Sequence, residues 1–184
     1  MDAFEQVVSE ILWMEGYWVR TSVKVELTKE EKVLIDRHSS PRWELDIVAY
    51  NGRDNLLRVV ECKSYFDSVG VKASCFDGSS PNDGKRYKLF NEPKLRQVVF
   101  NRLCLQLAAV GACRDAPQVC LSLACGKVRN ETDRAAISTH FEAQGWDFYD
   151  ERWLRERLQR MAQQGYENHV SAVVAKLLLR GKLE

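Results

Sequence analysis

Two apolar segments separated by a short run of turn-forming residues constrain the fold of this chain more than any other feature. Residues 43–50 and 56–65 are rich in valine, leucine and aromatic residues, a composition typical of strands. The intervening residues 51–55 read Asn-Gly-Arg-Asp-Asn, which favours a tight turn. The pattern therefore predicts an antiparallel β-hairpin in the first half of the chain.

The segments around this hairpin predict helices and further strands. Apolar residues recur at helical spacing over 4–12, and residues 19–27 alternate as in a half-buried strand. Residues 28–42 are expected to form an irregular connection and 66–92 a long loop. The remaining expected elements are a helix over 93–111, a strand over 119–124, a helix over 130–144, a strand over 146–149, and helices over 150–165 and 166–180.

This order of elements predicts an α/β fold in which a mixed central sheet is flanked by helices. We expect a single domain over residues 1–184, with a core of about 4–150 and a helical C-terminal extension of about 151–184. No internal repeat or low-complexity segment suggests a second core.

Composition and charge exclude several classes of protein. The chain has 184 residues, of which 45% are hydrophobic and 29% charged, so it is expected to fold rather than remain disordered. Its net charge is only +1, so nucleic-acid binding would have to depend on a local basic patch. The N-terminus does not resemble a signal peptide, and no apolar run has the roughly eighteen residues of a membrane span. We therefore expect a cytoplasmic protein without a membrane partner.

The six cysteines are expected to be reduced thiols. Cys62, Cys104 and Cys120 lie within apolar runs, where cysteine behaves as a small hydrophobic residue. The spacing of Cys113, Cys120 and Cys125 matches no paired zinc-ligand pattern, which argues against a zinc site.

Charged residues interrupt the predicted hairpin at positions that share one face on each strand. These residues are Glu44 and Asp46 on the first strand, and Glu61 and Lys63 on the second. If Asn51 pairs with Leu56, the antiparallel register places Asp46 opposite Glu61. Two carboxylates in that arrangement destabilise a sheet, and a divalent cation between them would reverse the effect.

Mg²⁺ or Mn²⁺ is the cation that these residues suit best. Magnesium prefers hard oxygen ligands, often one or two carboxylates together with phosphate oxygens. Asp46 and Glu61 can supply carboxylates, and the carbonyl of Cys62 can add a neutral ligand. Lys63 can then hold or activate a water molecule near a phosphate. The pattern predicts phosphodiester hydrolysis, although Glu61 and Lys63 could instead form an ordinary ion pair on an exposed strand.

The same residues resemble the PD-(D/E)xK nuclease superfamily, which has the restriction-endonuclease-like fold. The resemblance depends on Asp46 and on Glu61-Cys62-Lys63, which are separated by fourteen residues. Leu45 stands where the name-giving proline would be. The segments Phe4-Glu5-Gln6-Val7-Val8 and Glu15-Gly16-Tyr17 are similar to the opening of archaeal Holliday-junction resolvases and methylation-dependent restriction enzymes. The resemblance implies that Glu5 joins the metal site with Asp46, Glu61 and Cys62, and that Glu5, Asp46, Glu61 and Lys63 are catalytic.

The expected loop 66–92 and the start of the following helix combine basic and aromatic residues. The candidate nucleic-acid contacts are Lys72, Lys85, Arg86, Lys88 and Arg96. Phe76, Tyr87 and Phe90 are interleaved with them, which suits phosphate contact and base stacking. A solvated loop explains this composition equally well.

Two functions remain open from the sequence. The first is a metal-dependent DNA endonuclease that acts in restriction, repair or recombination. Cutting both strands would favour a homodimer of such an enzyme. The second is a catalytically inactive nuclease-fold protein that binds nucleic acid or a partner protein.

Overall fold

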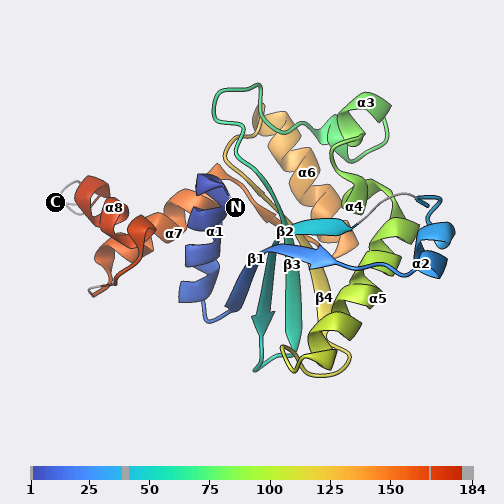
Figure 1. The fold of residues 1–184 in the computed structure, drawn as a ribbon. Helices are drawn as coiled ribbons and strands as arrows, with labels where there is room; N and C mark the ends of the chain where they lie inside the picture. The colour runs from blue at the N-terminus through green and yellow to red at the C-terminus, as the bar shows by residue number, and fades with distance from the viewer. Residues whose placement is uncertain (1, 39–41, 166, 180–184) are drawn as a thin grey trace.

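The computed structural model describes residues 2–38, 42–165 and 167–179, and its centre is a five-stranded sheet in the order β1-β2-β3-β4-β5 (Figure 1). The strands are β1 (Trp18–Val25), β2 (Trp43–Asn51), β3 (Leu56–Lys63), β4 (Gln118–Cys125) and β5 (Asp147–Tyr149). The first three are antiparallel, whereas β4 and β5 are added in parallel. The predicted α/β class with a mixed sheet is confirmed.

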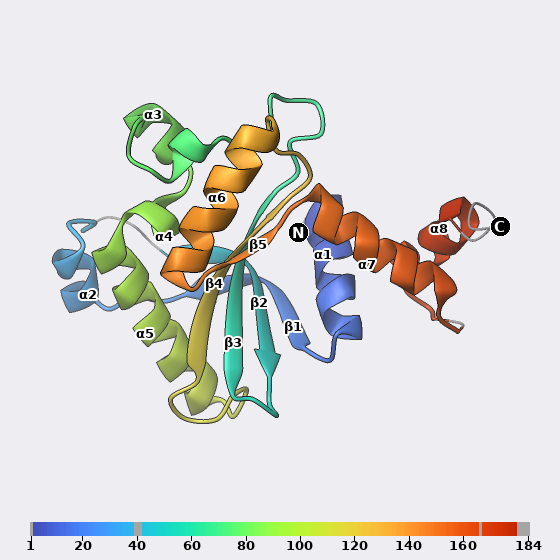
Figure 2. The ribbon, with the colours of Figure 1, turned by 180° about the vertical axis from the view of Figure 1, so that it is seen from behind.

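Helices cover both faces of the sheet. The longer ones are α1 (Ala3–Met14), α5 (Pro93–Ala109), α6 (Glu131–Gln144), α7 (Glu151–Gln163) and α8 (Val170–Leu179). The parallel connections β3 to β4 and β4 to β5 carry α5 and α6, which lie on one face of the sheet (Figure 2). When successive parallel strands are added in one direction across a sheet, right-handed crossovers place the connecting helices on the same face of the sheet. The opposite face is left to α1 and α7.

Each face of the sheet has its own hydrophobic core. Val59 on β3 packs with residues of α5 and α6, including Leu103 and Phe141. Val60, the next residue of β3, belongs instead to a core that it shares with residues of α1, including Leu12, and of α7, and α8 packs against α7. Successive side chains of a strand point to opposite faces, so a strand buried on both sides reads as the continuous apolar run seen in the sequence.

Local sequence signals explain where the main helices begin and end. The Asp2 carboxylate accepts the N–H of Glu5 at 2.8 Å, and Oε2 of Glu5 accepts the N–H of Asp2 at 3.1 Å, which makes a capping box at the start of α1. Asn130 caps α6 in a similar way, and Gly145 ends it with φ 68°, a left-handed conformation that favours glycine.

The expectation of an irregular connection over residues 28–42 is wrong for its first part. The structure has a short helix there, α2 (Lys29–Leu34), which begins with a capping box between Thr28 and Glu31. Arg102 of α5 donates two hydrogen bonds to Glu31 from Nε and one from Nη2, so tertiary contacts favour a helix too short to show apolar periodicity.

The expectation of a long loop over residues 66–92 is also wrong in part. This segment contains three short helical elements, η1 (Ala73–Cys75), α3 (Pro81–Gly84) and α4 (Lys88–Asn91). They pack beside α6 and place Phe76, Tyr87 and Phe90 in the core with α5 and α6. Single helical turns carry too few apolar residues to show a period, which is why the sequence suggested a loop.

Ser39, Ser40 and Pro41, expected at the end of a connection, lie outside the described residues, as do Tyr166 and Arg180, the expected limits of the last helix. Within the part of the chain that the structure describes, no helix is both long and apolar enough to cross a membrane. All six cysteines are free thiols, as the sequence predicted.

Candidate active site

The charged residues of the hairpin lie where β2 and β3 separate. The predicted register is confirmed, since Asn51 pairs with Leu56 and the ladder continues to Ile47 opposite Val60. The next step would place Asp46 directly opposite Glu61. There Oδ2 of Asp46 instead accepts the main-chain N–H of Cys62 at 2.8 Å. Asp46 therefore uses its side chain to tie β2 to β3 just beyond the last paired residues.

A local distortion of β1 and β2 accompanies this arrangement. On β1, Ser22 has φ 51°, between Thr21 and Val23, which pair with Ile47 and Leu45 of β2. Leu45 and Ile47 have the same parity along β2, yet Leu45 packs in the core with α5 and Ile47 in the core with α1. Strand β2 therefore twists at Asp46, the residue between them, and its carboxylate turns toward the end of β3.

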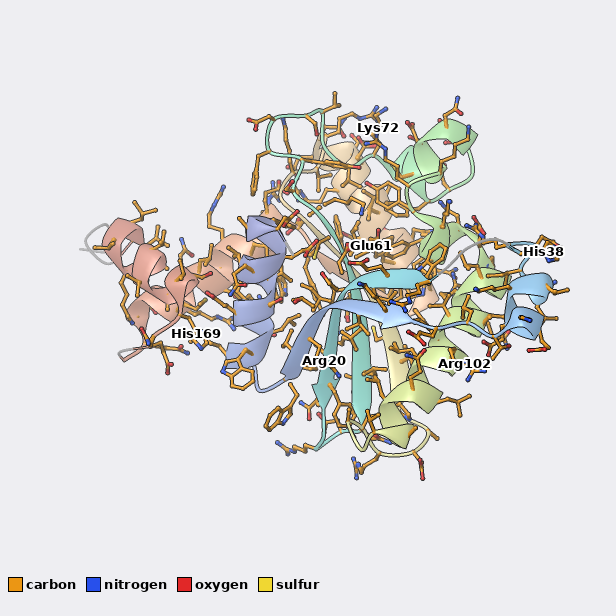
Figure 3. The ribbon with its side chains drawn as sticks, viewed as in Figure 1. Arg20, His38, Glu61, Lys72, Arg102 and His169 are labelled. Atoms are coloured by element: carbon orange, nitrogen blue, oxygen red, sulfur yellow. The ribbon has the colours of Figure 1, made fainter. Side chains whose placement is uncertain are left out.

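Lys63 connects the acidic groups of the site. Its Nζ lies 2.7 Å from Oε1 of Glu61, 3.1 Å from the carbonyl oxygen of Cys62 and 4.0 Å from Oδ2 of Asp46. The side chains of Lys63, Glu61 and Asp46 are 19%, 20% and 26% exposed. The Lys63 ammonium group thus lies among the three predicted oxygen ligands of a metal, which are the Asp46 and Glu61 carboxylates and the Cys62 carbonyl. Figure 3 shows Glu61 near the middle of the molecule, over the sheet.

Burial and neighbouring charges perturb the acid–base properties of the site. Burial raises the pKa of Glu61, and the nearby Asp46 and Glu5 carboxylates add to this effect, while Lys63 opposes it. Burial alone would lower the pKa of Lys63, but its contact with Glu61 outweighs this and raises it. The site therefore holds more negative charge than Lys63 neutralises.

The Cys62 thiol is not a candidate ligand. Burial raises its pKa well above the ordinary value, and the Asp46 carboxylate raises it further. Because a thiol must lose its proton to bind a metal, only the main-chain carbonyl of Cys62 can contribute. This agrees with the prediction, which assigned Cys62 to the site through its carbonyl.

Glu5 lies near the site but already has a structural role. Its carboxylate completes the capping box of α1, while its charge is close enough to raise the pKa values of Glu61 and Cys62. The structure therefore brings all four predicted catalytic residues into one region. Asp46 and Glu61 both lie within 4.0 Å of the Lys63 ammonium, and the charge of Glu5 raises the pKa values of Glu61 and Cys62.

The chain that follows Lys63 is packed tightly against the end of β4. A Cβ atom at Gly126 would lie 2.3 Å from the carbonyl oxygen of Ser64 and 2.6 Å from the Phe66 ring. The Phe66 ring in turn makes an edge contact with Phe4 of α1, with centroids 5.7 Å apart. Gly126 therefore allows the residues after Lys63 to pass between β4 and the start of α1. No pattern in the sequence pointed to this role.

The predicted nucleic-acid contacts differ in their exposure and in the partners that their side chains already have. Nζ of Lys72 lies 3.4 Å from Oδ1 of Asp83, and Figure 3 shows Lys72 displaced from Glu61 toward α3. Lys85 donates to Oδ1 of Asn82 at 2.9 Å. Lys85, Arg86 and Lys88 are exposed, whereas Arg96 is half-buried. Lys85, Arg86 and Lys88 are therefore the most exposed of the predicted contacts.

The base-stacking role proposed for the aromatic residues of this segment is wrong. Phe76, Tyr87 and Phe90 are only 7%, 2% and 4% exposed, because they form the core beneath α6. Sequence reasoning also missed Tyr65, a non-glycine residue with φ 49° two positions after Lys63. The Tyr65 hydroxyl lies near enough to Arg86 to raise the pKa of its guanidinium, so this basic residue is close to the chain that leaves the site.

Comparison with known proteins gives no family: no family model, no curated protein and no solved structure matches this chain. A search of the described residues for clusters of three or more His, Cys, Asp and Glu side chains able to hold a metal also finds none. The candidate site has two carboxylates that lie near Lys63, those of Asp46 and Glu61, and a main-chain carbonyl, so it has fewer than three such side chains.

Proposed function

We propose that this protein is a Mg²⁺- or Mn²⁺-dependent endonuclease that hydrolyses phosphodiester bonds of DNA, on a restriction-endonuclease-like fold. The observation that carries the proposal is the convergence of Asp46, Glu61 and Lys63 where β2 and β3 separate. Burying two carboxylates and an ammonium group carries a desolvation penalty, and such groups are enriched at functional sites.

The donor groups suit a hard divalent cation. Asp46, Glu61 and the carbonyl of Cys62 offer oxygen atoms only, which is the preference of magnesium and manganese. The raised pKa of Glu61 reflects burial and an excess of negative charge, which a cation would compensate. Glu5 adds charge at longer range. When bound, the metal would supply Lewis-acid stabilisation of the phosphate undergoing attack.

Lys63 is the residue that we assign to the chemical step. Its ammonium group already lies between oxygens of Glu61 and Cys62, so it can hold a water molecule beside the phosphate and stabilise the negative charge that develops there. Asp46 fixes the distance between β2 and β3 through the N–H of Cys62, which keeps the reacting groups in register.

Substrate binding is assigned to the exposed basic residues after the site. Arg86 is exposed and lies near Tyr65, which raises its pKa, and Lys85 and Lys88 flank it on the same short segment. Such side chains can contact consecutive phosphates of a DNA strand. Cutting both strands favours two active sites, so the proposal includes a homodimer. It also includes a cytoplasmic location.

Cleavage of supercoiled plasmid, linear, single-stranded and branched DNA, in a series of divalent metals, tests this function. We expect nicking or cutting with Mg²⁺ or Mn²⁺ that Asp46→Asn and Glu61→Gln abolish. Glu44→Gln is the matched control, because Glu44 is an exposed acid two residues from Asp46 on the same strand. A protein that cuts none of these DNA forms with any divalent metal would contradict the proposal.

A non-cutting protein that binds nucleic acid or a partner is the second candidate. It is favoured by the ion pair of Lys63 with Glu61, which partly neutralises the site without a metal, and by the absence of a three-side-chain metal cluster among the described residues. Binding of the same DNA forms without cleavage would favour this function.

A further inference from the structure

A hollow opens between the 73–93 segment and α6, and its lining contains none of the candidate catalytic residues. Its volume is about 600 Å³, within the range of small-molecule sites. The lining includes Lys85, Phe90, Asn91, Arg96, His140 and Trp146. α3 lies beside α6 in both ribbon views, which marks this side of the molecule (Figures 1 and 2).

Arg96 lines this hollow as a half-buried cation without an acidic partner. Its Nη1 donates to the carbonyl oxygens of Leu89 at 2.8 Å and Phe90 at 3.1 Å. Its guanidinium carbon lies 5.0 Å from the centroid of the Trp146 ring. Within the described residues no carboxylate lies within ion-pair distance of this group, and burial lowers its pKa.

Other arginines of the protein that are partly buried show the contrast. Arg37, Arg58, Arg102 and Arg134 each contact at least one carboxylate. Glu92, one helical turn before Arg96, binds Arg37 through both carboxylate oxygens, at 2.9 and 2.7 Å. Two carbonyl contacts leave Nε and Nη2 of Arg96 able to donate to an anion, because a guanidinium carries five N–H groups.

The walls of the hollow are fixed by hydrogen bonds. Nδ2 of Asn91 donates to the carbonyl oxygens of Cys75 at 2.8 Å and Gly84 at 3.1 Å, which holds η1, α3 and α4 together. A Cβ atom at Gly84 would come within 3.0 Å of that amide nitrogen, so glycine permits the close approach. A wall that is already ordered loses little entropy when a ligand binds.

Aromatic and amide groups stand beside the cation. The rings of His140 and Trp146 lie 5.8 Å apart at 68°. Asp77 also lines the hollow, but its carboxylate accepts the N–H of Ser79 at 2.8 Å, and His140 lies near enough to contribute to lowering its pKa after the larger effect of Ser79. Asp77 therefore stays ionised, whereas Glu92 is paired with Arg37. The two cations of the lining, Lys85 and Arg96, outnumber the one acid without a cationic partner, which favours an anion.

We propose that this hollow binds a nucleoside phosphate, either free or as one nucleotide of a single strand. Arg96 takes the phosphate, the His140 and Trp146 rings contact the planar base, and the Gln144 amide and Oδ1 of Asn91 meet its polar edge, since both N–H groups of Asn91 are already used. A phosphate alone would fill only a small part of about 600 Å³, whereas a nucleotide has a suitable size and combines an anion with an aromatic ring. This site does not require that the protein cleave DNA.

Isothermal titration calorimetry in EDTA tests the site with three probes: the four deoxynucleoside 5′-monophosphates, the matching nucleosides, and inorganic phosphate. We expect the monophosphates to bind at least tenfold more tightly than nucleosides or phosphate. Arg96→Met, which keeps an aliphatic side chain against Trp146, and His140→Ala should each weaken binding at least tenfold. Arg53→Met is the charge-matched control, since the Arg53 side chain is 92% exposed in the hairpin turn.

A short single-stranded oligonucleotide distinguishes the two sources of the ligand. Binding of the oligonucleotide alone, with the same dependence on Arg96 and His140, assigns the site to a strand; binding of free monophosphates assigns it to a free nucleotide. If Arg96→Met does not fold, as judged by circular dichroism, His140→Ala carries the test. The proposal is overturned if neither the monophosphates nor the oligonucleotide bind, or if inorganic phosphate or the nucleosides bind as tightly as these ligands. It is also overturned if Arg53→Met weakens binding as much as Arg96→Met does.

The outcome is separable from that of the proposed function. Asp46→Asn should bind nucleotide like the wild type, because Asp46 is not among the lining residues. Loss of cleavage with retained nucleotide binding, or a wild type that binds nucleotide and cuts nothing, would bear on the endonuclease proposal alone.

Discussion

The two substitutions Asp46→Ala and Asp46→Asn should separate the structural role of this carboxylate from its role in the site. The Cys62 residue, whose N–H binds Oδ2 of Asp46 at 2.8 Å, is only 8% exposed. Alanine would leave that N–H buried without an acceptor, which costs about 1–3 kcal/mol. The Asp46 side chain is 26% exposed, and its removal relieves repulsion with Glu61, so we expect the lower part of that range, about 1–2 kcal/mol.

Asparagine keeps an acceptor oxygen for Cys62 and loses only the charge. We therefore expect Asp46→Asn to lie within about 0.5 kcal/mol of the wild type, while both variants lose divalent-metal binding and cleavage. Urea denaturation without metal measures the stabilities, and calorimetry with Mn²⁺ measures the affinity. Equal stability of the two variants would refute the structural role of the hydrogen bond, and unchanged metal affinity in Asp46→Asn would refute the metal site.

Three further predictions concern the same site and its surroundings. Lys63→Ala should lower turnover by at least about a hundredfold with little change in DNA or metal affinity, and Lys63→Arg should restore little of it; single-turnover kinetics would check both, and wild-type rates in Lys63→Ala would exclude the catalytic role. The folded-state pKa of Glu61 is raised above 4.5, so its contribution to the stability of the metal-free protein should be lost as the pH rises from 4.5 through the folded-state pKa. Metal binding should release protons for the same reason. Glu61→Gln should remove both effects, measured by denaturation and calorimetry at several pH values. Replacing Lys85, Arg86 and Lys88 by alanine should reduce the salt dependence of DNA binding by up to about 0.9 in log–log slope per lost phosphate contact, measured by fluorescence anisotropy; an unchanged slope would remove this segment from the interface.

The sheet and the paired acids could be predicted from the sequence because they depend on short-range patterns. Turn residues 51–55 fixed the hairpin register, and the register in turn brought Asp46 near Glu61. Alternation could not predict the twist of β2 at Asp46, because a local departure from the regular ladder, such as φ 51° at Ser22 on β1, leaves no trace in a period-two pattern. The hydrogen bond from Cys62 to Asp46 could not be predicted for the same reason.

The 66–92 segment shows why tertiary packing was harder to anticipate. Its aromatic residues were interpreted as ligands for bases, but Phe76, Tyr87 and Phe90 cover the core beneath α6. Mixed polar and aromatic composition is compatible with either outcome, and burial depends on α6, a helix some forty or more residues later in the chain. The role of Arg96 likewise depends on Trp146, which only the folded chain brings beneath its guanidinium.

Gly126 makes the candidate site vulnerable at a position that has no functional group. A single methyl group there would collide with the main chain at Ser64, the residue directly after Lys63, and not merely with a movable side chain. The collision could be relieved only by shifting the end of β3 or the end of β4, and a displacement of even 1 Å is enough to misplace a reacting group. In a random mutagenesis screen for loss of activity, Gly126 should therefore behave like a catalytic residue, although no chemistry passes through it.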